Sequence, residues 1–304
     1  MSKLCLYCGK ELNTDNLKWH RACIKKMFNS TSIPEFSFDS EKEINENLDK
    51  GSSVTGVQKK FSLSSTTLNL RKIYSTFNNE YIIKTQQKNL NNIVYYEWLG
   101  MKLATICGIN TVECGIIESN NELLFITKRI DRINNKKVPM EDFCQLSNTQ
   151  TEYKYNGSYE KCYKNVIKKF SNYETLDKIY FYKIILFSYI IGNTDMHLKN
   201  FSLYEEDGKY RMTPAYDLVP VLMVFNQEEM ALTINGKNKN LTKKDFYAFG
   251  ASMGIQKSIL DFTHNSINKS KDKMINFINH TELSDQEKRK FIDLIEKRIN
   301  EVCD

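Results

Sequence analysis

Short apolar runs separated by polar segments dominate the first half of the chain, and they predict strands. Runs rich in β-branched and aromatic residues occur at 61–64, 68–74, 81–84, 111–117 and 123–127. Short runs of this composition, bounded by polar turns, favour an antiparallel sheet. One segment breaks the pattern, because residues 91–107 carry apolar side chains at helical intervals and Gly108 is a suitable helix stop.

Beyond Arg132 the apolar residues recur mainly with helical spacing. Helices are predicted at 163–170, 176–191, 243–253, 267–278 and from Ser284 onward. The last of these begins with Ser284-Asp-Gln-Glu287, the signature of a capping box. A sheet-rich half followed by a helical half predicts an α+β chain with a cleft.

Length and composition narrow the class of protein. The chain has 304 residues, which corresponds to about two structural units at roughly 100–200 residues per domain. Hydrophobic residues make up 41% and there are only 12 Gly and 4 Pro, so collagenous and wholly disordered classes are excluded. Composition and motifs together predict three parts: a Cys/His module with its linker at 1–50, then 51–130, then 131–304.

No membrane partner is expected, since the most apolar run, 179–191, contains Lys183 and is shorter than the about 18 residues of a membrane span. The opening Met-Ser-Lys-Leu-Cys lacks the apolar stretch of a secretory signal, which predicts a cytoplasmic protein with reduced cysteines. The net charge of +6 does not identify a partner, because basic and acidic residues are interleaved.

Near the N-terminus, Cys5-x2-Cys8 is followed by His20-x2-Cys23. Two pairs with this spacing suit tetrahedral Zn²⁺, and Gly9 supplies the permissive backbone that a knuckle requires. Such an ion would be structural, because four protein ligands leave no position for a substrate. The alternative is that these residues are small buried side chains of a short module.

The segment that carries most chemistry is Gly192-Asn-Thr-Asp195-Met-His-Leu-Lys-Asn200, followed by Pro214-Ala-Tyr-Asp217. Phosphoryl transfer uses an aspartate that orients the acceptor hydroxyl, plus an amide and a second carboxylate that hold Mg²⁺. Asp195, Asn200 and Asp217 are these three types, and the Asp-x4-Asn interval is that of the protein-kinase catalytic loop. Asn193-Thr194 receives no role from the pattern.

The first half offers groups that could bind phosphate. Lys84 ends an apolar strand, and Glu97 in the following helix is placed to neutralise it. The small residues between Gly51 and Lys60 form a turn whose backbone N–H groups could face phosphate, although this turn is no Walker A motif.

Seven blocks, in order, resemble the HipA-type Ser/Thr kinases of bacterial toxin–antitoxin systems. They are Gly56-Val-Gln-Lys-Lys-Phe, Tyr81-Ile-Ile-Lys84, Tyr96-Glu97-Trp-Leu, Lys128-Arg-Ile-Asp131-Arg132, Glu141-Asp142-Phe-Cys-Gln145, the Gly192 loop and Pro214-Ala-Tyr-Asp217-Leu. The resemblance runs from about residue 50 to the C-terminus and is closest to the HipT branch. It implies a two-lobed protein-kinase-like fold with a sheet-rich N-lobe, an all-helical C-lobe and an ATP cleft between them.

The resemblance also implies roles for individual residues. Asp195 corresponds to the catalytic aspartate, Asn200 and Asp217 to the Mg²⁺ ligands, and Lys84 to the phosphate-binding lysine. The other implied ATP contacts are Thr55, Gly56, Val57, Gln58, Lys59, Lys60, Lys128, Arg129, Ile130, His197, Lys199 and residues 216–219.

Ser53 and Thr55 fall where these kinases phosphorylate themselves. A phosphate adds about −1.5 to −2 charge at pH 7, which should repel the phosphates of ATP. Autophosphorylation is therefore expected to switch the enzyme off.

The resemblance implies an ATP-dependent kinase toxin that phosphorylates a translation component such as an aminoacyl-tRNA synthetase for glutamate or tryptophan. A HipB-like helix-turn-helix antitoxin is the implied partner, and DNA would be contacted only through it. Two alternatives stay open: a catalytically silent kinase fold that acts with a DNA-bound repressor, and a zinc-bearing nucleic-acid protein.

Overall fold

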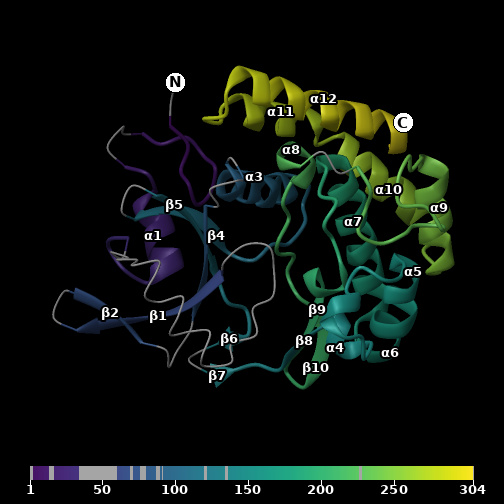
Figure 1. Ribbon diagram of the computed structural model, residues 1–304, viewed down its shortest axis with the longest axis horizontal. Coiled ribbons are helices and arrows are strands. Elements are labelled where there is room, and N and C mark those ends of the chain that lie inside the picture. The colour runs from purple at the N-terminus through teal and green to yellow at the C-terminus, as the bar shows by residue number, and fades with distance from the viewer. Residues whose placement is uncertain are drawn as a thin grey trace. The chain divides into compact units, whose positions relative to one another are not determined.

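The computed structural model (Figure 1) divides into two compact units, which are described separately. Unit 1 comprises Met1–Trp98 with Val112–Lys136, and unit 2 comprises Leu99–Thr111 with Lys137–Asp304. The structure describes residues 3–13, 17–33, 60–68, 71–75, 80–86, 90, 92–119, 122–133, 136–225 and 228–303.

Unit 1 is built on a five-stranded antiparallel sheet with the order β2-β1-β3-β5-β4. Its strands are β1 (Lys60–Leu68), β2 (Arg71–Ser75), β3 (Tyr81–Thr85), β4 (Cys114–Ser119) and β5 (Glu122–Lys128), and the short pair β6 (Arg132–Ile133) and β7 (Lys136–Lys137) follows. Two of its four pairings, β1 with β2 and β4 with β5, join strands that are consecutive in sequence, whereas β3 lies between β1 and β5. The predicted antiparallel sheet is confirmed.

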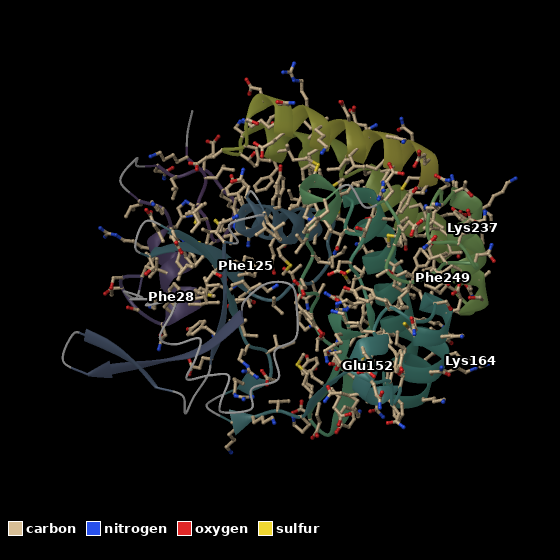
Figure 2. All side chains as sticks on the ribbon, in the orientation of Figure 1. Phe28, Phe125, Glu152, Lys164, Lys237 and Phe249 are labelled. Carbon is tan, nitrogen blue, oxygen red and sulfur yellow. The ribbon has the colours of Figure 1, made fainter. Side chains whose placement is uncertain are left out.

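One face of this sheet is covered by the N-terminal segment and helix α1 (Arg21–Phe28). The apolar cluster includes Trp19 and Phe28 from the segment and Tyr81, Ile83 and Ile126 from the strands. Figure 2 labels Phe28 on α1 and Phe125 on β5. Because side chains alternate between the two faces of a strand, Phe125 and Lys84 lie on the opposite face from Ile83 and Ile126.

Trp19 fixes the N-terminal segment to β4. Its indole Nε1 donates to the carbonyl of Ile116 at 2.8 Å, and the amide of Ile116 donates to the carbonyl of Leu6 at 3.0 Å. A Cβ on Gly115 would lie 2.4 Å from the Trp19 ring, so only glycine allows this close approach. The segment is therefore integrated into the sheet rather than appended to it.

Unit 2 is mainly helical. Its helices are α4 (Phe143–Leu146), α5 (Tyr159–Cys162), α6 (Lys168–Phe170), α7 (Glu174–Ile191), α8 (Val221–Val224), α9 (Lys243–Ser252), α10 (Lys257–Asn268), α11 (Lys271–Asn279) and α12 (Asp285–Val302), with short turns at Thr151–Tyr153, Tyr163–Ile167 and Leu198–Asn200. Helix α3 (Ile93–Ile106) contributes residues to both units.

The core of unit 2 surrounds α7, whose second half is buried on all sides. Phe181 on this helix packs edge-to-face against Phe201, with ring centroids 4.9 Å apart, and also contacts Phe249 on α9 (Figure 2). Gly192 ends α7 in the left-handed conformation with φ 74°, which is a usual glycine stop. This stop releases the chain into the loop that carries Asp195.

The all-helical description of the second half requires a correction, because unit 2 contains a three-stranded sheet in the order β10-β9-β8. Its strands are β8 (Met140–Asp142), β9 (Ser202–Glu206) and β10 (Lys209–Met212). Asp207 and Gly208 join β9 to β10 with φ values of 51° and 74°, as a tight hairpin turn of the primed type requires. No strand was predicted from the sequence beyond residue 127, so this hairpin was missed.

Several predicted helix bounds were also wrong. Residues 267–278 were predicted as one helix, whereas α10 ends at Asn268 and α11 begins at Lys271; α10 itself was missed. The segment predicted at 163–170 starts earlier, at Tyr159. The capping box of α12 is confirmed, with Ser284 Oγ accepting from the Glu287 amide. Among the described residues, no helix combines the length and apolarity of a membrane span.

Candidate nucleotide and metal sites

The loop after α7 places Asn200 and Asp217 in direct contact within unit 2. Asn200 ends the short helical turn Leu198–Asn200, and its Nδ2 donates to Asp217 Oδ2 at 3.0 Å. The side chain of Asn200 is buried, and its Oδ1 accepts no hydrogen bond from any residue that the structure describes. A buried oxygen without a donor normally costs free energy, which a cation would offset by coordination.

Asp217 has a backbone suited to its position. Its φ of 60° lies in the left-handed region, which aspartate and asparagine tolerate better than other residues with a side chain. Carboxylate and amide oxygens are hard donors of the kind that Mg²⁺ binds. Asn200 and Asp217 therefore fit the predicted Mg²⁺ site in chemistry and in contact.

Asn193 joins the Asp195 loop to the Asp217 segment. Its Oδ1 accepts from the amide of Asp195 and its Nδ2 donates to the carbonyl of Asp217, both at 3.4 Å. Asn193 is 1% exposed, so this bridge is shielded from water. The residue that had no role in the sequence thus connects two of the candidate catalytic groups.

Asp195 accepts a hydrogen bond from Tyr155, whose hydroxyl donates to Oδ1 at 2.8 Å. The pKa of Tyr155 is raised above its ordinary value, first by burial and then by the negative charges of Asp195 and Asp217. Both carboxylates therefore act on one phenol. Asp195 and Asp217 therefore lie in the same region of unit 2.

The remaining predicted residues of unit 2 support this loop. Lys199 Nζ forms a 2.6 Å ion pair with Asp142, the residue that caps α4. Tyr216 donates to the Lys199 carbonyl at 3.1 Å, and burial raises its pKa. His197 is buried, with its ring 5.0 Å from that of Tyr155. In this conformation Lys199 neutralises Asp142.

In unit 1, Lys84 and Glu97 form the predicted ion pair. Lys84 is 5% exposed on β3 and Glu97 is fully buried on α3. The ammonium also lies 5.6 Å from the centre of the Phe125 ring. A buried charge requires such a partner, so Glu97 holds Lys84 in place.

The strip after β5 is organised by Asp131. Arg129 donates to its carboxylate at 2.8 and 2.7 Å, and Arg132 donates at 2.6 Å. Burial opposes the ionised form of Asp131, but the two arginines lower its pKa overall. The amide of Lys128 donates to the backbone carbonyl of Glu113, and the amide of Arg129 donates to that of Glu80. Ile130 lies in the turn that follows. Among the residues predicted to contact ATP, Lys128 and Arg129 thus have backbone amides that are already hydrogen-bonded within the protein.

The turn between Gly51 and Lys60, which was predicted to face phosphate, lies almost entirely outside the described residues. Ser53, Thr55, Gly56, Val57, Gln58 and Lys59 lie outside the described residues. Lys60 begins β1 and pairs with Lys84 in the register of the sheet.

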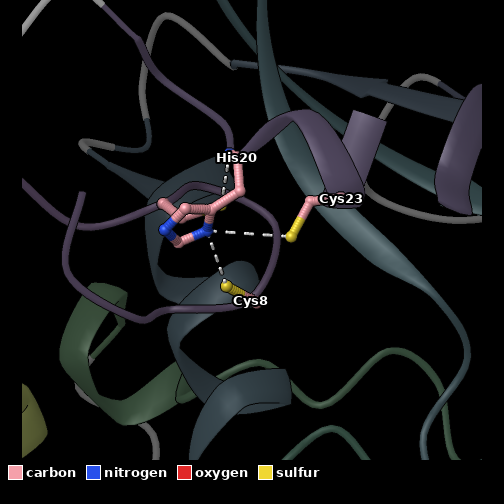
Figure 3. Close-up of side chains that lie close together, drawn as sticks. Cys8, His20 and Cys23 are labelled. Atoms are coloured by element: carbon pink, nitrogen blue, oxygen red, sulfur yellow. Dashed lines mark hydrogen bonds between the residues drawn. The ribbon is translucent and has the colours of Figure 1, made fainter. Parts of the chain in front are cut away.

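Cys5, Cys8, His20 and Cys23 converge in unit 1, as the two sequence pairs predicted, and their candidate ligand atoms all lie within 4.8 Å of one another. Figure 3 shows three of them, with Cys8 and Cys23 beside the ring of His20. His20 Nδ1 is 3.4 Å from Cys8 Sγ and 3.8 Å from Cys23 Sγ. These spacings match the edges of a tetrahedron with Zn–S bonds of about 2.3 Å and Zn–N bonds of about 2.0 Å.

The surroundings of this Cys/His cluster also suit a metal. His20 Nε2 lies 3.0 Å from the carbonyl of Glu11, and a proton donated there leaves Nδ1 to face the three sulfurs. Gly9, with φ 72°, donates its amide to the Cys5 carbonyl and closes the knuckle. The pKa of Cys5 is lowered to about 4, mainly by the hydrogen bond from Cys8 and against the effect of burial.

Sequence reasoning missed Tyr155 and the bridging role of Asn193. Tyr155 lies 40 positions before Asp195, so no local spacing relates the two residues. For Asn193 a signal existed, because it directly follows a helix-ending glycine beside a candidate catalytic residue. An amide there commonly forms local backbone contacts.

The chain matches the family model described as HipA-like C-terminal domain over residues 52–282. It therefore belongs to the HipA-like family. It is 26% identical over 260 residues to the "Putative kinase" of Haemophilus influenzae, an alignment that covers 75% of each chain. It is 23% identical to the serine/threonine-protein kinase toxin HipA of Shewanella oneidensis, and this alignment covers 68% of this chain and 53% of the relative.

Solved structures confirm the fold. The HipA of Shewanella oneidensis, solved with HipB and operator DNA, matches with a TM-score of 0.68 at 20% identity, over 89% of this chain and 74% of that chain. The Helicobacter pylori proinflammatory kinase CtkA matches with a TM-score of 0.56 at 15% identity, over 75% and 89%. The fold is the α+β, kinase-like fold of HipA, as the seven sequence blocks predicted.

Proposed function

We propose that the protein is an ATP-dependent serine/threonine protein kinase and the toxin of a HipBA-like toxin–antitoxin system. Asp195 accepts the proton of the substrate hydroxyl, and Asn200 and Asp217 bind Mg²⁺. Lys84 contacts the phosphates of ATP and is held for this by Glu97. Bound Mg²⁺-ATP supplies the phosphoryl group and neutralises its developing charge.

The observation that carries the proposal concerns Asn200, whose Nδ2 donates to the Asp217 carboxylate while its buried Oδ1 accepts from none of the described residues. A scaffold has no use for an acceptor that is desolvated and left without a donor. Asn193 connects this pair to Asp195, so hydrogen bonds link the proposed base to the proposed metal ligands. This arrangement favours catalysis over the alternative of a silent kinase-fold module that acts with a DNA-bound repressor.

The remaining family expectations are part of the proposal. A HipB-like antitoxin is the proposed partner, since the Shewanella relative is solved with HipB and DNA. The protein would contact DNA only through that antitoxin, and its proposed location is the cytoplasm. The proposed target is a translation component such as an aminoacyl-tRNA synthetase.

Two further points stay predictions. They are membership of the HipT branch and the domain boundaries at residues 50 and 130.

Regulation is proposed to act through Ser53 and Thr55. A phosphate on either residue would bring about −1.5 to −2 charge next to the residues predicted to hold ATP. Mass spectrometry of the protein after incubation with Mg²⁺-ATP should find phosphate at one or both positions.

The decisive experiment incubates the full-length chain with ATP labelled in its γ-phosphate and a bacterial lysate, then identifies the labelled serines and threonines. Asp195→Asn should lower labelling by about a thousandfold, because an amide accepts the substrate proton poorly. The matched control is Asp207→Asn, the same change in an exposed turn of unit 2. Equal labelling by wild type and Asp195→Asn would refute catalysis by this loop.

We further propose that the Cys/His cluster binds one structural Zn²⁺ per chain. Three thiolates and one imidazole complete a tetrahedron and leave no open position, so the ion would stabilise unit 1 without taking part in phosphoryl transfer. Elemental analysis of the purified chain should find about one zinc. A metal-free chain with an intact unit 1 would instead show that the four residues are ordinary core.

A further inference from the structure

Tyr155 contacts the proposed catalytic base in a way that neither the motifs nor the comparisons assign. Its hydroxyl lies 2.8 Å from Asp195 Oδ1, a normal length for a donor to a carboxylate. Although Tyr155 is 43% exposed, its hydroxyl is directed at this carboxylate rather than at solvent. The contact calls for a functional explanation.

Two further contacts attach the segment of this tyrosine to the loop that contains Asp195, and a third, between Lys154 and the Tyr155 ring, lies within the segment. The ring of Tyr155 meets His197 edge-to-face, with centroids 5.0 Å apart and an interplanar angle of 80°. The carbonyl of Lys154 accepts from the amide of Leu198 at 3.2 Å, and the Lys154 ammonium lies 4.9 Å from the Tyr155 ring centre. Backbone and ring are thus both held, which is unlike a side chain that swings in and out.

We propose that Tyr155 is a positioning residue that orients the Asp195 carboxylate toward the hydroxyl of the protein substrate. The inference rests on the proposed kinase function and adds a residue to that site. A carboxylate has two oxygens with about four acceptor positions, so a phenol on Oδ1 leaves room for a substrate hydroxyl. With one oxygen held, rotation about the Cβ–Cγ bond is restricted.

The phenol acts as a donor only while it keeps its proton. Burial and the charges of Asp195 and Asp217 raise the pKa of Tyr155, so the donor form persists throughout the physiological pH range. A neutral donor steadies the carboxylate and leaves it charged, whereas a lysine would neutralise it. Tyrosine is therefore well suited to hold a general base.

The test compares Tyr155→Phe with Tyr153→Phe in the full-length chain. The control removes the same hydroxyl two residues away, from a side chain that is 50% exposed. Tyr155→Phe should lower kcat about tenfold, the typical effect of one hydrogen bond to a charged group, with KM for ATP unchanged. The Mg²⁺-ATP-dependent rise in Tm should also be unchanged, because this role does not involve nucleotide binding.

A second comparison asks whether Tyr155 acts through Asp195. In the Asp195→Asn background, adding Tyr155→Phe should change the residual rate less than twofold, because the carboxylate that it orients is gone. A further tenfold loss there would assign Tyr155 an independent structural role and overturn the inference.

Other outcomes also overturn it. A Tyr155→Phe enzyme that is faster than wild type would show that the phenol competes with substrate, and phosphate on Tyr155 would make it an acceptor. Tyr155→Phe kinetics equal to those of Tyr153→Phe, with an active wild type, would refute only this inference. A wild-type chain without kinase activity would instead refute the proposed function, and the positioning role with it.

Discussion

Each unit of the molecule contains one cluster suited to a metal ion, and the two clusters differ in donor type and in closure. In unit 1, Cys5, Cys8, His20 and Cys23 offer three sulfurs and a nitrogen. In unit 2, Asn200 and Asp217 offer oxygens only. Soft donors suit zinc and hard oxygens suit magnesium.

The number of coordination positions that each cluster leaves open is more informative than its donor type. Four protein ligands complete a tetrahedron, so the Cys/His cluster can contribute stability and cannot accept a substrate. Two protein ligands leave most positions of an octahedral ion to phosphate oxygens and water. The number and type of donors thus distinguish the proposed structural site from the proposed catalytic site.

The largest expected effect is loss of the Cys/His cluster. Cys8→Ser should abolish zinc binding and expose Trp19, because structural zinc contributes on the order of 10 kcal/mol of apparent binding free energy. Zinc content and tryptophan fluorescence measure the result. Cys162→Ser, at a cysteine buried in unit 2, is the control and should retain zinc. Full zinc content in the Cys8→Ser variant would contradict the proposal that this cluster binds zinc.

The next largest effect concerns the buried ion pair of unit 1. Lys84→Met leaves the Glu97 carboxylate buried without its main partner, and should lower the free energy of unfolding by about 3–5 kcal/mol. The double variant Lys84→Met/Glu97→Leu should recover most of that loss, because neither charge then remains buried. Denaturant unfolding measures both. Equal stability of the single variant and wild type would mean that Lys84 is not paired in solution.

The proposed Mg²⁺ site at Asn200 and Asp217 predicts that Mg²⁺-ATP stabilises the protein, an effect of intermediate size. At a concentration 100 times its Kd, Mg²⁺-ATP should stabilise the wild type by about 2.7 kcal/mol. Asp217→Asn keeps the left-handed backbone but removes a charged ligand, and should abolish the rise in Tm. Asp207→Asn should preserve it, since Asp207 has a similar φ of 51° and is exposed. A full rise in Tm with Asp217→Asn would refute the Mg²⁺ site.

The smallest effect concerns a helix cap in unit 2. Asp245 accepts from the Thr242 amide and from Lys237, and these bonds outweigh burial and lower its pKa to about 2. Because the folded pKa is below the usual 3.8, the stabilisation is present above about pH 4 and is lost as pH falls toward 2.

Asp245→Ala should accordingly cost about 1–2 kcal/mol at pH 7 and much less at pH 2. Unfolding at both pH values measures the change, and the zinc content at pH 7 should stay normal, because Asp245 lies outside the Cys/His cluster. An equal loss at pH 2 and pH 7 would contradict the contribution of an ionised Asp245.

Much of this protein could be predicted because its chemistry is local. The four residues of the Cys/His cluster lie in two pairs at ligand spacing, and Ser284 with Glu287 caps a helix from neighbouring positions. Asp195 follows the end of a long apolar helix at Gly192. In each case residues that are close in sequence determine the local geometry, so the sequence is enough to predict it.

Other features depended on contacts between distant segments. Residues 267–278 have a continuous apolar pattern, yet the chain turns after Asn268, and packing decides such breaks. The hairpin of β9 and β10 pairs with a third strand, β8, in which Met140 lies opposite Tyr204 although the two residues are 64 positions apart in sequence. Periodicity within a segment carries no information about such partners.

The sequence alone therefore determined the family and the α+β class, and it supplied the proposed catalytic residues Asp195, Asn200 and Asp217 and the four residues of the Cys/His cluster. Only the tertiary structure decided that Tyr155 donates to Asp195, that Asn193 bridges to Asp217, and that Trp19 seals the N-terminal segment onto β4. Local spacing governs the first group. The second depends on which distant side chains the packed core brings within hydrogen-bonding distance.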